Sequence, residues 1–201
     1  ENYDQEKFER KLYITRKAIR TALQDVEDLI ITSMSSRTIV YKGMLIPHQM
    51  EHFFPDLSDP RLSSAMALVH TRFPTNTFPR WDLVQPFRNL AHNGEINSLR
   101  GNINWMLGRR PTLSSPLYDN ISEMQPIIIP RGSDSACMDN VFEFLIQSGY
   151  SLPHAMMMMV PEAWEKNPEM NPEKQAFYEF HDHLMEPWDG PASLTFTDGV
   201  R

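Results

Sequence analysis

The sequence predicts a single α+β domain, and three observations support that class. Segments with apolar residues at helical spacing alternate with short runs rich in β-branched residues. These runs never settle into regular β-α-β units, which disfavours a doubly wound parallel sheet. The chain has 201 residues, of which 41% are hydrophobic and 22% charged, so it can build one domain with a sizeable core.

The elements are expected in the following order. The first helix covers residues 6–31, with its apolar face formed by Leu12, Ala18, Ile19, Ala22, Val26, Leu29 and Ile30. Further helices are expected at 47–54, where Pro47 suits a first turn, and at 99–107, 136–146, 152–159 and 172–185. Strands are expected at 38–41, 65–70, 87–91 and 192–197, the last ending in Asp-Gly, a hairpin signal. The segments 56–61, 109–119 and 161–168 are expected to be connections.

Charge and cysteine content exclude several classes of protein. The net charge is −7 and the isoelectric point is near 5.5, which argues against a nucleic-acid partner. A single cysteine excludes an internal disulfide and a CxxC zinc site. No apolar stretch approaches the roughly 18 residues that a membrane span requires. We therefore expect a cytoplasmic protein without a membrane partner, or an organellar one if a preceding segment carries a transit peptide.

The segment from Ala91 to Asn97 is the most informative part of the chain. An apolar run leads into Asn93-Gly94, the pair most able to adopt positive φ, and Asn97 or Ser98 suits the cap of the next helix. A turn at a strand end would place the Asn93 side-chain amide beside the Gly94 backbone N–H. Two such neutral donors can form an oxyanion hole. The alternative is a plain hairpin turn.

Two further loops follow apolar runs. Arg72 comes after the run at 65–69, in a loop stiffened by Pro74, where a guanidinium can clamp a carboxylate. Asp134 comes after the run at 127–129, at the start of a helix, where it could bind an ammonium group or simply cap the helix. If Ser133 is the cap, Asp134 is free for a ligand. Together the three loops suit the head and the side-chain amide of a free amino acid.

Four blocks of the sequence carry a family resemblance: HTRFPTNT at residue 70, PFRNLAHNGEINSLRGN at 86, RGSDSACMDNVFE at 131 and EPWDGPASLTFTDG at 186. From Thr38 to Arg201 the chain closely resembles the class II glutamine amidotransferase domain of the glutamate synthase large subunits. That resemblance implies a four-layer αββα sandwich of the N-terminal-nucleophile type. It also implies hydrolysis of L-glutamine to glutamate and ammonia, with ammonia channelled to 2-oxoglutarate in a separate synthase domain of the same polypeptide.

The resemblance also assigns roles to individual residues. Arg72 resembles the arginine that binds the α-carboxylate of glutamine, and Thr75 the threonine that steadies its loop. The side chain of Asn93 and the backbone N–H of Gly94 resemble the oxyanion hole. Glu95 and Asp134 resemble the carboxylates that lie near the α-amino group. Gly132 resembles a residue that shapes the loop carrying Asp134. FMN, an iron–sulfur cluster and an electron-transfer subunit or ferredoxin are implied for other regions, and no cofactor is expected in residues 1–201.

One departure concerns the nucleophile, which in this family is a cysteine at the mature N-terminus. Residue 1 is glutamate here, and Cys137 lies in an apolar helical segment where it should act as a small hydrophobe. We therefore expect a single partial domain over 1–201, cut at both ends and inactive alone. Two alternatives remain open: a class II amidotransferase of the glucosamine 6-phosphate or asparagine type, and a non-catalytic binding module on the same fold.

Two sequence features suggest metal sites but have simpler explanations. Met156 to Met159 span every face of a helix, which favours core packing over a soft-metal site. His181 and His183, with His154, could suggest a metal centre, but residues two apart on a helix point about 200° apart. No metal is expected.

Overall fold

A computed structural model of the chain describes residues 4–26, 29–71 and 79–201. Its α-helices are α1 (Gln5–Ala22), α2 (Met50–Phe53), α3 (Leu99–Arg109), α4 (Asp134–Gln147), α5 (Leu152–Met159) and α6 (Pro172–Asp182). Its strands are β1 (Leu90–Gly94) and β2 (Ala192–Phe196). Short 3₁₀ turns lie at Pro47–Gln49, Pro55–Ser58, Trp81–Leu83, Arg110–Thr112 and Ile121–Met124.

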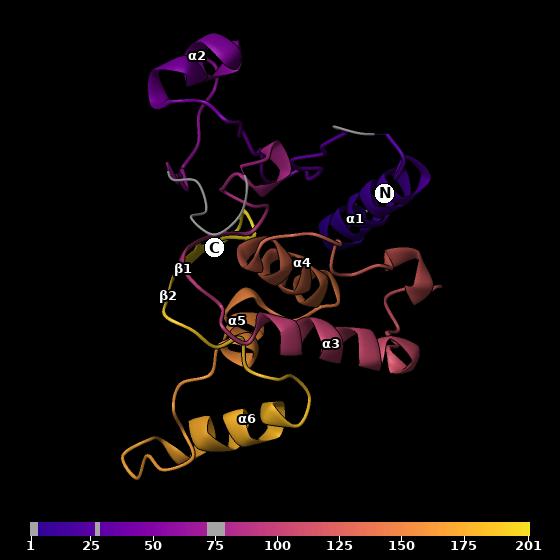
Figure 1. Ribbon diagram of the computed structural model, residues 1–201, viewed down its shortest axis with the longest axis vertical. Helices are drawn as coiled ribbons and strands as arrows, with labels where there is room; N and C mark the ends of the chain where they lie inside the picture. The colour runs from indigo at the N-terminus through magenta and orange to yellow at the C-terminus, as the bar shows by residue number, and fades with distance from the viewer. Residues whose placement is uncertain (1–3, 27–28, 72–78) are drawn as a thin grey trace.

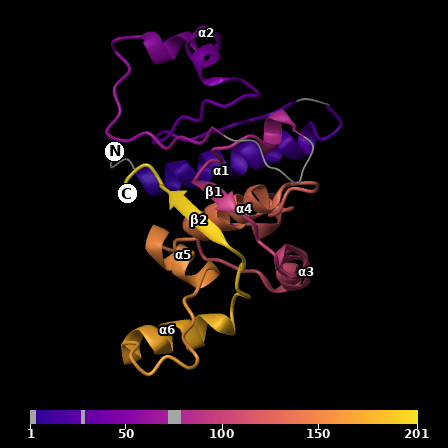
Figure 2. The same ribbon diagram turned by 60° about the vertical axis from the view of Figure 1, so that its left-hand side comes forward.

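Helix α4 lies at the centre of the fold (Figure 1). It contacts α1, α5 and β1, and α6 packs beyond α5 at the edge of the molecule. The strands β1 and β2 form a two-stranded antiparallel ribbon beside α4, which Figure 2 shows from another side. The segment that carries α2 projects away from the rest of the chain (Figure 1).

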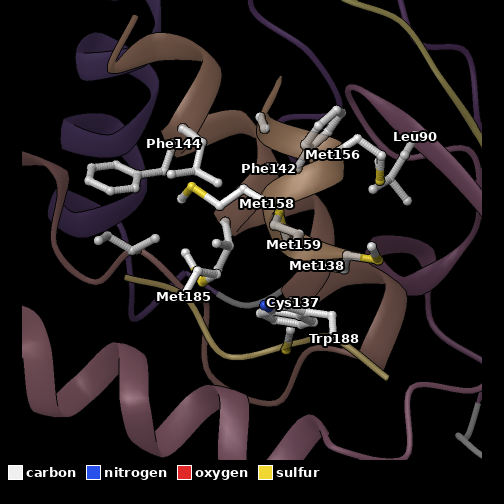
Figure 3. Close-up of a cluster of buried hydrophobic side chains, with 14 of the residues drawn as sticks. Leu90, Cys137, Met138, Phe142, Phe144, Met156, Met158, Met159, Met185 and Trp188 are labelled. Carbon is white, nitrogen blue, oxygen red and sulfur yellow. The ribbon is translucent and has the colours of Figure 1, made fainter. Parts of the chain in front are cut away.

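The core forms around α4 because this helix is buried on nearly every face, with buried polar residues as well as apolar ones. Figure 3 shows Cys137, Met138 and Phe142 of α4 with the methionines of α5 and the ring of Trp188. The most deeply buried members are Leu90, Met124, Met138, Val141, Phe142, Ala155, Met159 and Trp188. Met156, Met158 and Met159 are all buried here, which confirms the core-packing interpretation of that run.

Helix α1 is shorter than predicted and buries a different face. It starts at the Asp4 cap, whose side chain accepts from Lys7 N at 3.0 Å, and ends at Ala22 rather than near residue 31. Most side chains of the predicted apolar face are exposed. The buried residues of the helix are Glu9, Tyr13, Arg16 and Lys17. Charged side chains are buried because they find partners: Arg16 pairs with Glu143 of α4, and Lys17 Nζ donates to the Ile127 carbonyl oxygen at 3.0 Å.

Two predicted strands are absent from the described residues. Residues 38–41 and 65–70 have no strand pairing, and the strand predicted at 87–91 lies at 90–94 instead. The helices predicted at 47–54, 99–107, 136–146 and 152–159 are confirmed, and the one predicted at 172–185 ends earlier, at Asp182. An apolar run alone cannot specify a strand, because a strand also requires a neighbour with free backbone groups.

Candidate active site at the end of strand β1

The ribbon sets the direction of every backbone group along β1. Its residues pair in register from Leu90 with Phe196 to Gly94 with Ala192. Thr197 N donates to Asn89 O at 2.8 Å and Glu95 N to Pro191 O at 3.0 Å, so the hydrogen-bonded pairs fall on the odd residues of this strand. Because pairs alternate in an antiparallel ladder, the N–H of Gly94 points away from β2. Asn93 and Gly94 are both exposed at this strand end.

Glycine is required where the chain after β1 closely approaches the segment before β2. Gly94 has φ 144°, and a Cβ there would lie 1.9 Å from the carbonyl oxygen of Pro191. Gly190 has φ 155°, and a Cβ there would lie 1.8 Å from the carbonyl oxygen of Glu95. The Asn-Gly pair is therefore not a plain hairpin turn, because its partner strand is about a hundred residues away in sequence. The close approach continues through Asn97 N, which donates to Asp189 O at 2.8 Å.

Ser133, and not Asp134, is the cap of α4. Ser133 caps α4, its side chain accepting from Ala136 N at 3.2 Å. Asp134 is thereby free of the cap, and its Oδ2 accepts from Ile96 N at 3.0 Å. Its Oδ1 accepts from Ser135 N at 2.7 Å and from Ser135 Oγ at 3.2 Å. The Asp134 side chain stays 22% exposed, so the carboxylate is fixed and still accessible.

A buried histidine connects β1 to this helix start. His92 Nδ1 lies 2.8 Å from Ser135 Oγ and 3.9 Å from Asp134 Oδ2. Because Ser135 gives its single hydroxyl proton to Asp134, His92 Nδ1–H donates to Ser135 Oγ in the neutral ring. Burial lowers the pKa of His92, which Asp134 opposes and His70 reinforces. His92 therefore stays neutral near pH 7 and holds Ser135 against Asp134.

The loop before α4 is tight at Gly132. A Cβ at Gly132 would lie 3.2 Å from Cys137 Sγ and 3.3 Å from the carbonyl oxygen of Ile129. Arg131 beside it has φ 63°, in the left-handed region that non-glycine residues seldom adopt. Glu95 is exposed next to Gly94, and its backbone N–H is the one bonded to Pro191. Arg72 and Thr75 lie outside the described residues.

Cys137 lies in the core, away from solvent. Its exposed fraction is 2%, and burial raises the pKa of its thiol to about 12, with a smaller contribution from Asp134. A thiol in such surroundings is unreactive, since the thiolate is the nucleophile. The structure thus agrees with the interpretation of Cys137 as a small hydrophobe.

The described residues contain no cluster of three or more His, Cys, Asp or Glu side chains that could hold a metal ion. Two of the histidines considered in the sequence do meet: His154 Nε2 lies 2.8 Å from His181 Nε2. His183 is not part of that pair, and its Nδ1 lies 2.8 Å from Glu179 O. Over the same ranges, no helix is long and apolar enough to cross a bilayer.

The sequence did not identify two groups that shape this site. Gln85 bonds the backbone of His92 on the edge of β1 that faces away from β2. The segment Asp189 to Pro191 accepts bonds from the residues that follow β1. The only available signal for the second was the co-occurrence of the blocks at 86 and 186, which the structure brings into direct contact.

Residues 1–201 match the model of the class-II glutamine amidotransferases, and the chain belongs to that family. It is homologous to glutamate synthase large chains. The "Glutamate synthase [NADPH] large chain" of Bacillus subtilis is 50% identical over 196 residues, which are 96% of this chain and 13% of that protein. The "Glutamate synthase [NADH]" of Saccharomyces cerevisiae is 50% identical over 199 residues, 98% of this chain and 9% of that one.

A plant relative matches over the same range. The "Ferredoxin-dependent glutamate synthase 2, chloroplastic" of Arabidopsis thaliana is 45% identical over 198 residues, which are 95% of this chain and 12% of that protein. The chain thus spans between 9% and 13% of the length of these relatives. The family is the one that the four sequence blocks indicated, so that resemblance is confirmed.

Proposed function

We propose that this chain carries the glutamine-binding and oxyanion-stabilising part of a glutamate synthase. The reaction is hydrolysis of L-glutamine to glutamate and ammonia. The observation that supports it best is the end of β1, where an exposed asparagine amide lies beside a glycine N–H that points away from the neighbouring strand. Such donors stabilise negative charge that develops on the amide oxygen as a nucleophile attacks.

Each site residue has a defined role in this proposal. The amide of Asn93 and the N–H of Gly94 hold the tetrahedral oxyanion. Asp134 receives the α-ammonium group of glutamine: its carboxylate has about four lone-pair positions, of which three accept bonds from Ile96 N, Ser135 N and Ser135 Oγ. Glu95 adds negative charge beside it, and Gly132 permits the tight loop before α4.

Arg72 and Thr75 complete the substrate site in the proposal as the clamp for the α-carboxylate, on the grounds of their motif. The nucleophile is an N-terminal cysteine outside these residues, because Cys137 is buried and its pKa is raised. We place residues 1–201 within one amidotransferase domain of four-layer αββα architecture, in which the β1–β2 ribbon belongs to a larger sheet.

The rest of the enzyme supplies the synthase step. Ammonia passes to a synthase domain of the same polypeptide, where 2-oxoglutarate becomes glutamate with FMN, an iron–sulfur cluster and electrons from a nicotinamide cofactor or ferredoxin. The residues of this chain do not fit the cluster, since clusters are held by several cysteine thiolates and the chain has one cysteine. A cytoplasmic or organellar location accompanies this proposal.

The test is Asn93→Ala in a full-length glutamate synthase that contains this domain. We expect glutamine-dependent turnover to fall on the order of 100-fold, as for loss of one oxyanion donor, with a small change in the KM for glutamine. Glutamate synthesis from added ammonia should continue. A raised KM with unchanged kcat would contradict the oxyanion role of Asn93.

A further inference from the structure

We infer that Gln85 is a positioning residue for the Asn93–Gly94 donor pair, an inference that rests on the proposed function. Its side-chain amide makes two hydrogen bonds to the backbone of His92, the residue immediately before Asn93. Gln85 Nε2 donates to His92 O at 2.7 Å, and His92 N donates to Gln85 Oε1 at 2.7 Å. Gln85 is 7% exposed and His92 is 2% exposed, so water does not compete for these bonds.

The two bonds lie on the edge of β1 that faces away from β2. The register makes the even residues of this strand point their backbone groups to that edge. Leu90 O accepts there from Phe87 N at 2.9 Å, and His92 is paired by Gln85. The amide of Gln85 thus takes the place that a neighbouring strand would occupy, because it offers one donor and one acceptor in a plane, as a peptide does. Gly94 is the next residue whose N–H points to the same edge.

This arrangement fixes the peptide plane that leads into the proposed oxyanion hole. The carbonyl of His92 and the nitrogen of Asn93 belong to one rigid peptide unit. Holding that carbonyl at 2.7 Å sets the orientation in which the chain enters Asn93, while Glu95 N, bonded to Pro191 O, holds the far side of Gly94. A donor that stabilises a transition state acts only if it is aimed before the reaction, so a small misplacement lowers the rate.

The position requires an amide in particular. An ionised glutamate would place a carboxylate oxygen against the His92 carbonyl oxygen and could not donate to it. A methionine would have similar length but would leave both His92 groups buried without partners. A protonated glutamate, in contrast, has one donor and one acceptor and can reproduce both bonds.

The experiment compares Gln85→Met and Gln85→Glu in a full-length glutamate synthase carrying this domain. For Gln85→Met we expect glutamine-dependent kcat to fall about 10-fold or more, with a KM for glutamine within about 3-fold of the parent. Synthesis from ammonia should be unchanged. For Gln85→Glu we expect activity relative to the parent to rise as pH falls from 8 to 6, as the buried carboxyl is protonated. The Gln85→Met variant should show no such relative rise.

Backbone hydrogen exchange supplies a readout apart from activity. In Gln85→Met, exchange in peptides that span residues 85–94 should be faster than in the parent, since His92 N–H has lost its acceptor. The matched control is Gln49→Met, because Gln49 also bonds a backbone N–H, that of Ile46 at 3.0 Å, but lies on the exposed segment that carries α2. Turnover and exchange at residues 85–94 should not change in this control.

The Asn93→Ala variant distinguishes a failure of the proposed function from a failure of the positioning role of Gln85. If Asn93→Ala leaves glutamine-dependent kcat unchanged, the proposed function of this site fails. If Asn93→Ala lowers kcat but Gln85→Met does not, or Gln85→Glu shows no relative rise at low pH, the positioning role of Gln85 is overturned and the proposed function stands.

Discussion

Asp134 Oδ2 accepts a hydrogen bond from the backbone N–H of Ile96, with the two atoms 3.0 Å apart. This bond joins the start of α4 to the loop that follows Asn93 and Gly94. The loop proposed to bind the α-ammonium group and the loop proposed to stabilise the oxyanion therefore form one structural unit. The backbone from Gly94 to Ile96 thus connects the end of β1 to the Asp134 carboxylate.

Asp134→Asn should weaken glutamine binding in the full-length enzyme. One side-chain oxygen becomes an NH₂ group, which removes the charge that pairs with the ammonium and an acceptor for the surrounding N–H groups. We expect the KM for glutamine to rise roughly 10- to 100-fold, the range for loss of a hydrogen bond to a charged group. Steady-state kinetics with varied glutamine measures this change.

Ser133→Ala is the control for that variant. It removes the cap of α4 and should lower the free energy of unfolding by about 1 kcal/mol without a change in the KM. An equal rise in KM for Ser133→Ala and Asp134→Asn would show that the helix start, and not the carboxylate, determines glutamine binding.

Gly94→Ala should disrupt the pairing of β1 with β2 at this end of the ribbon. The added Cβ would lie 1.9 Å from Pro191 O, and backbone cannot move aside without breaking the Glu95–Pro191 bond. We expect a loss of about 3 kcal/mol or more in the free energy of unfolding, a magnitude typical of strain at a special backbone conformation combined with lost packing. Denaturant unfolding followed by circular dichroism measures it.

The matched control is Gly101→Ala in α3, where a Cβ would meet no atom within 4 Å. This variant should gain up to about 1 kcal/mol, because alanine has a higher helix propensity than glycine. Similar losses at both glycines would contradict the steric account of Gly94.

The sequence predicted the helices better than the strands for a physical reason. The apolar runs of α4 and α5 were long enough to specify a helix from local spacing alone, and both were confirmed. The residues at 65–70 had the same apolar character, but no strand among the described residues pairs with them. The strand predicted at 192–197 is confirmed as β2, but no local pattern could indicate that it pairs with β1.

In the candidate site, too, the sequence predicted only the residues that have a local signature. Asn93, Gly94 and Asp134 were visible as motifs, because turns and helix starts have local signatures. Gln85 and His92 were not, since a glutamine that bonds a strand edge has no local pattern. The charged face of α1 was also missed, because Arg16 is buried only where Glu143 meets it from α4.

Cys137 should be unreactive in the native protein. Its 2% exposure and raised pKa, about 12, predict no modification by a disulfide reagent until the chain unfolds. Cys137→Ser should be less stable than Cys137→Ala, since a hydroxyl buried without a partner costs roughly 1–3 kcal/mol. In the full-length enzyme, Cys137→Ala should retain glutamine hydrolysis. A loss of turnover without a loss of stability would contradict a purely structural role.

The contact between α5 and α6 includes a hydrogen bond between two histidines, His154 and His181. His181 Nδ1 lies 2.7 Å from the carbonyl oxygen of Phe177, so this nitrogen carries a proton and donates it. His181 Nε2 is then an acceptor, and His154 Nε2–H donates to it at 2.8 Å. Burial lowers the pKa of His154, and the neighbouring His181 lowers it further.

Thermal stability should therefore fall as pH is lowered below 6.5. A histidine whose pKa is lower in the folded state binds fewer protons there, so its stabilising effect is present above the unfolded pKa of about 6.5 and is lost as pH falls toward the folded value. His154→Phe keeps an aromatic ring against Phe177 and Tyr150 but cannot titrate. We expect the melting temperature of this variant to depend less on pH between 7 and 5 than that of the parent. His183→Gln is the control, because His183 is exposed and outside the pair, and it should keep the parental slope. An identical slope for His154→Phe and the parent would show that the α5–α6 contact does not depend on this pair.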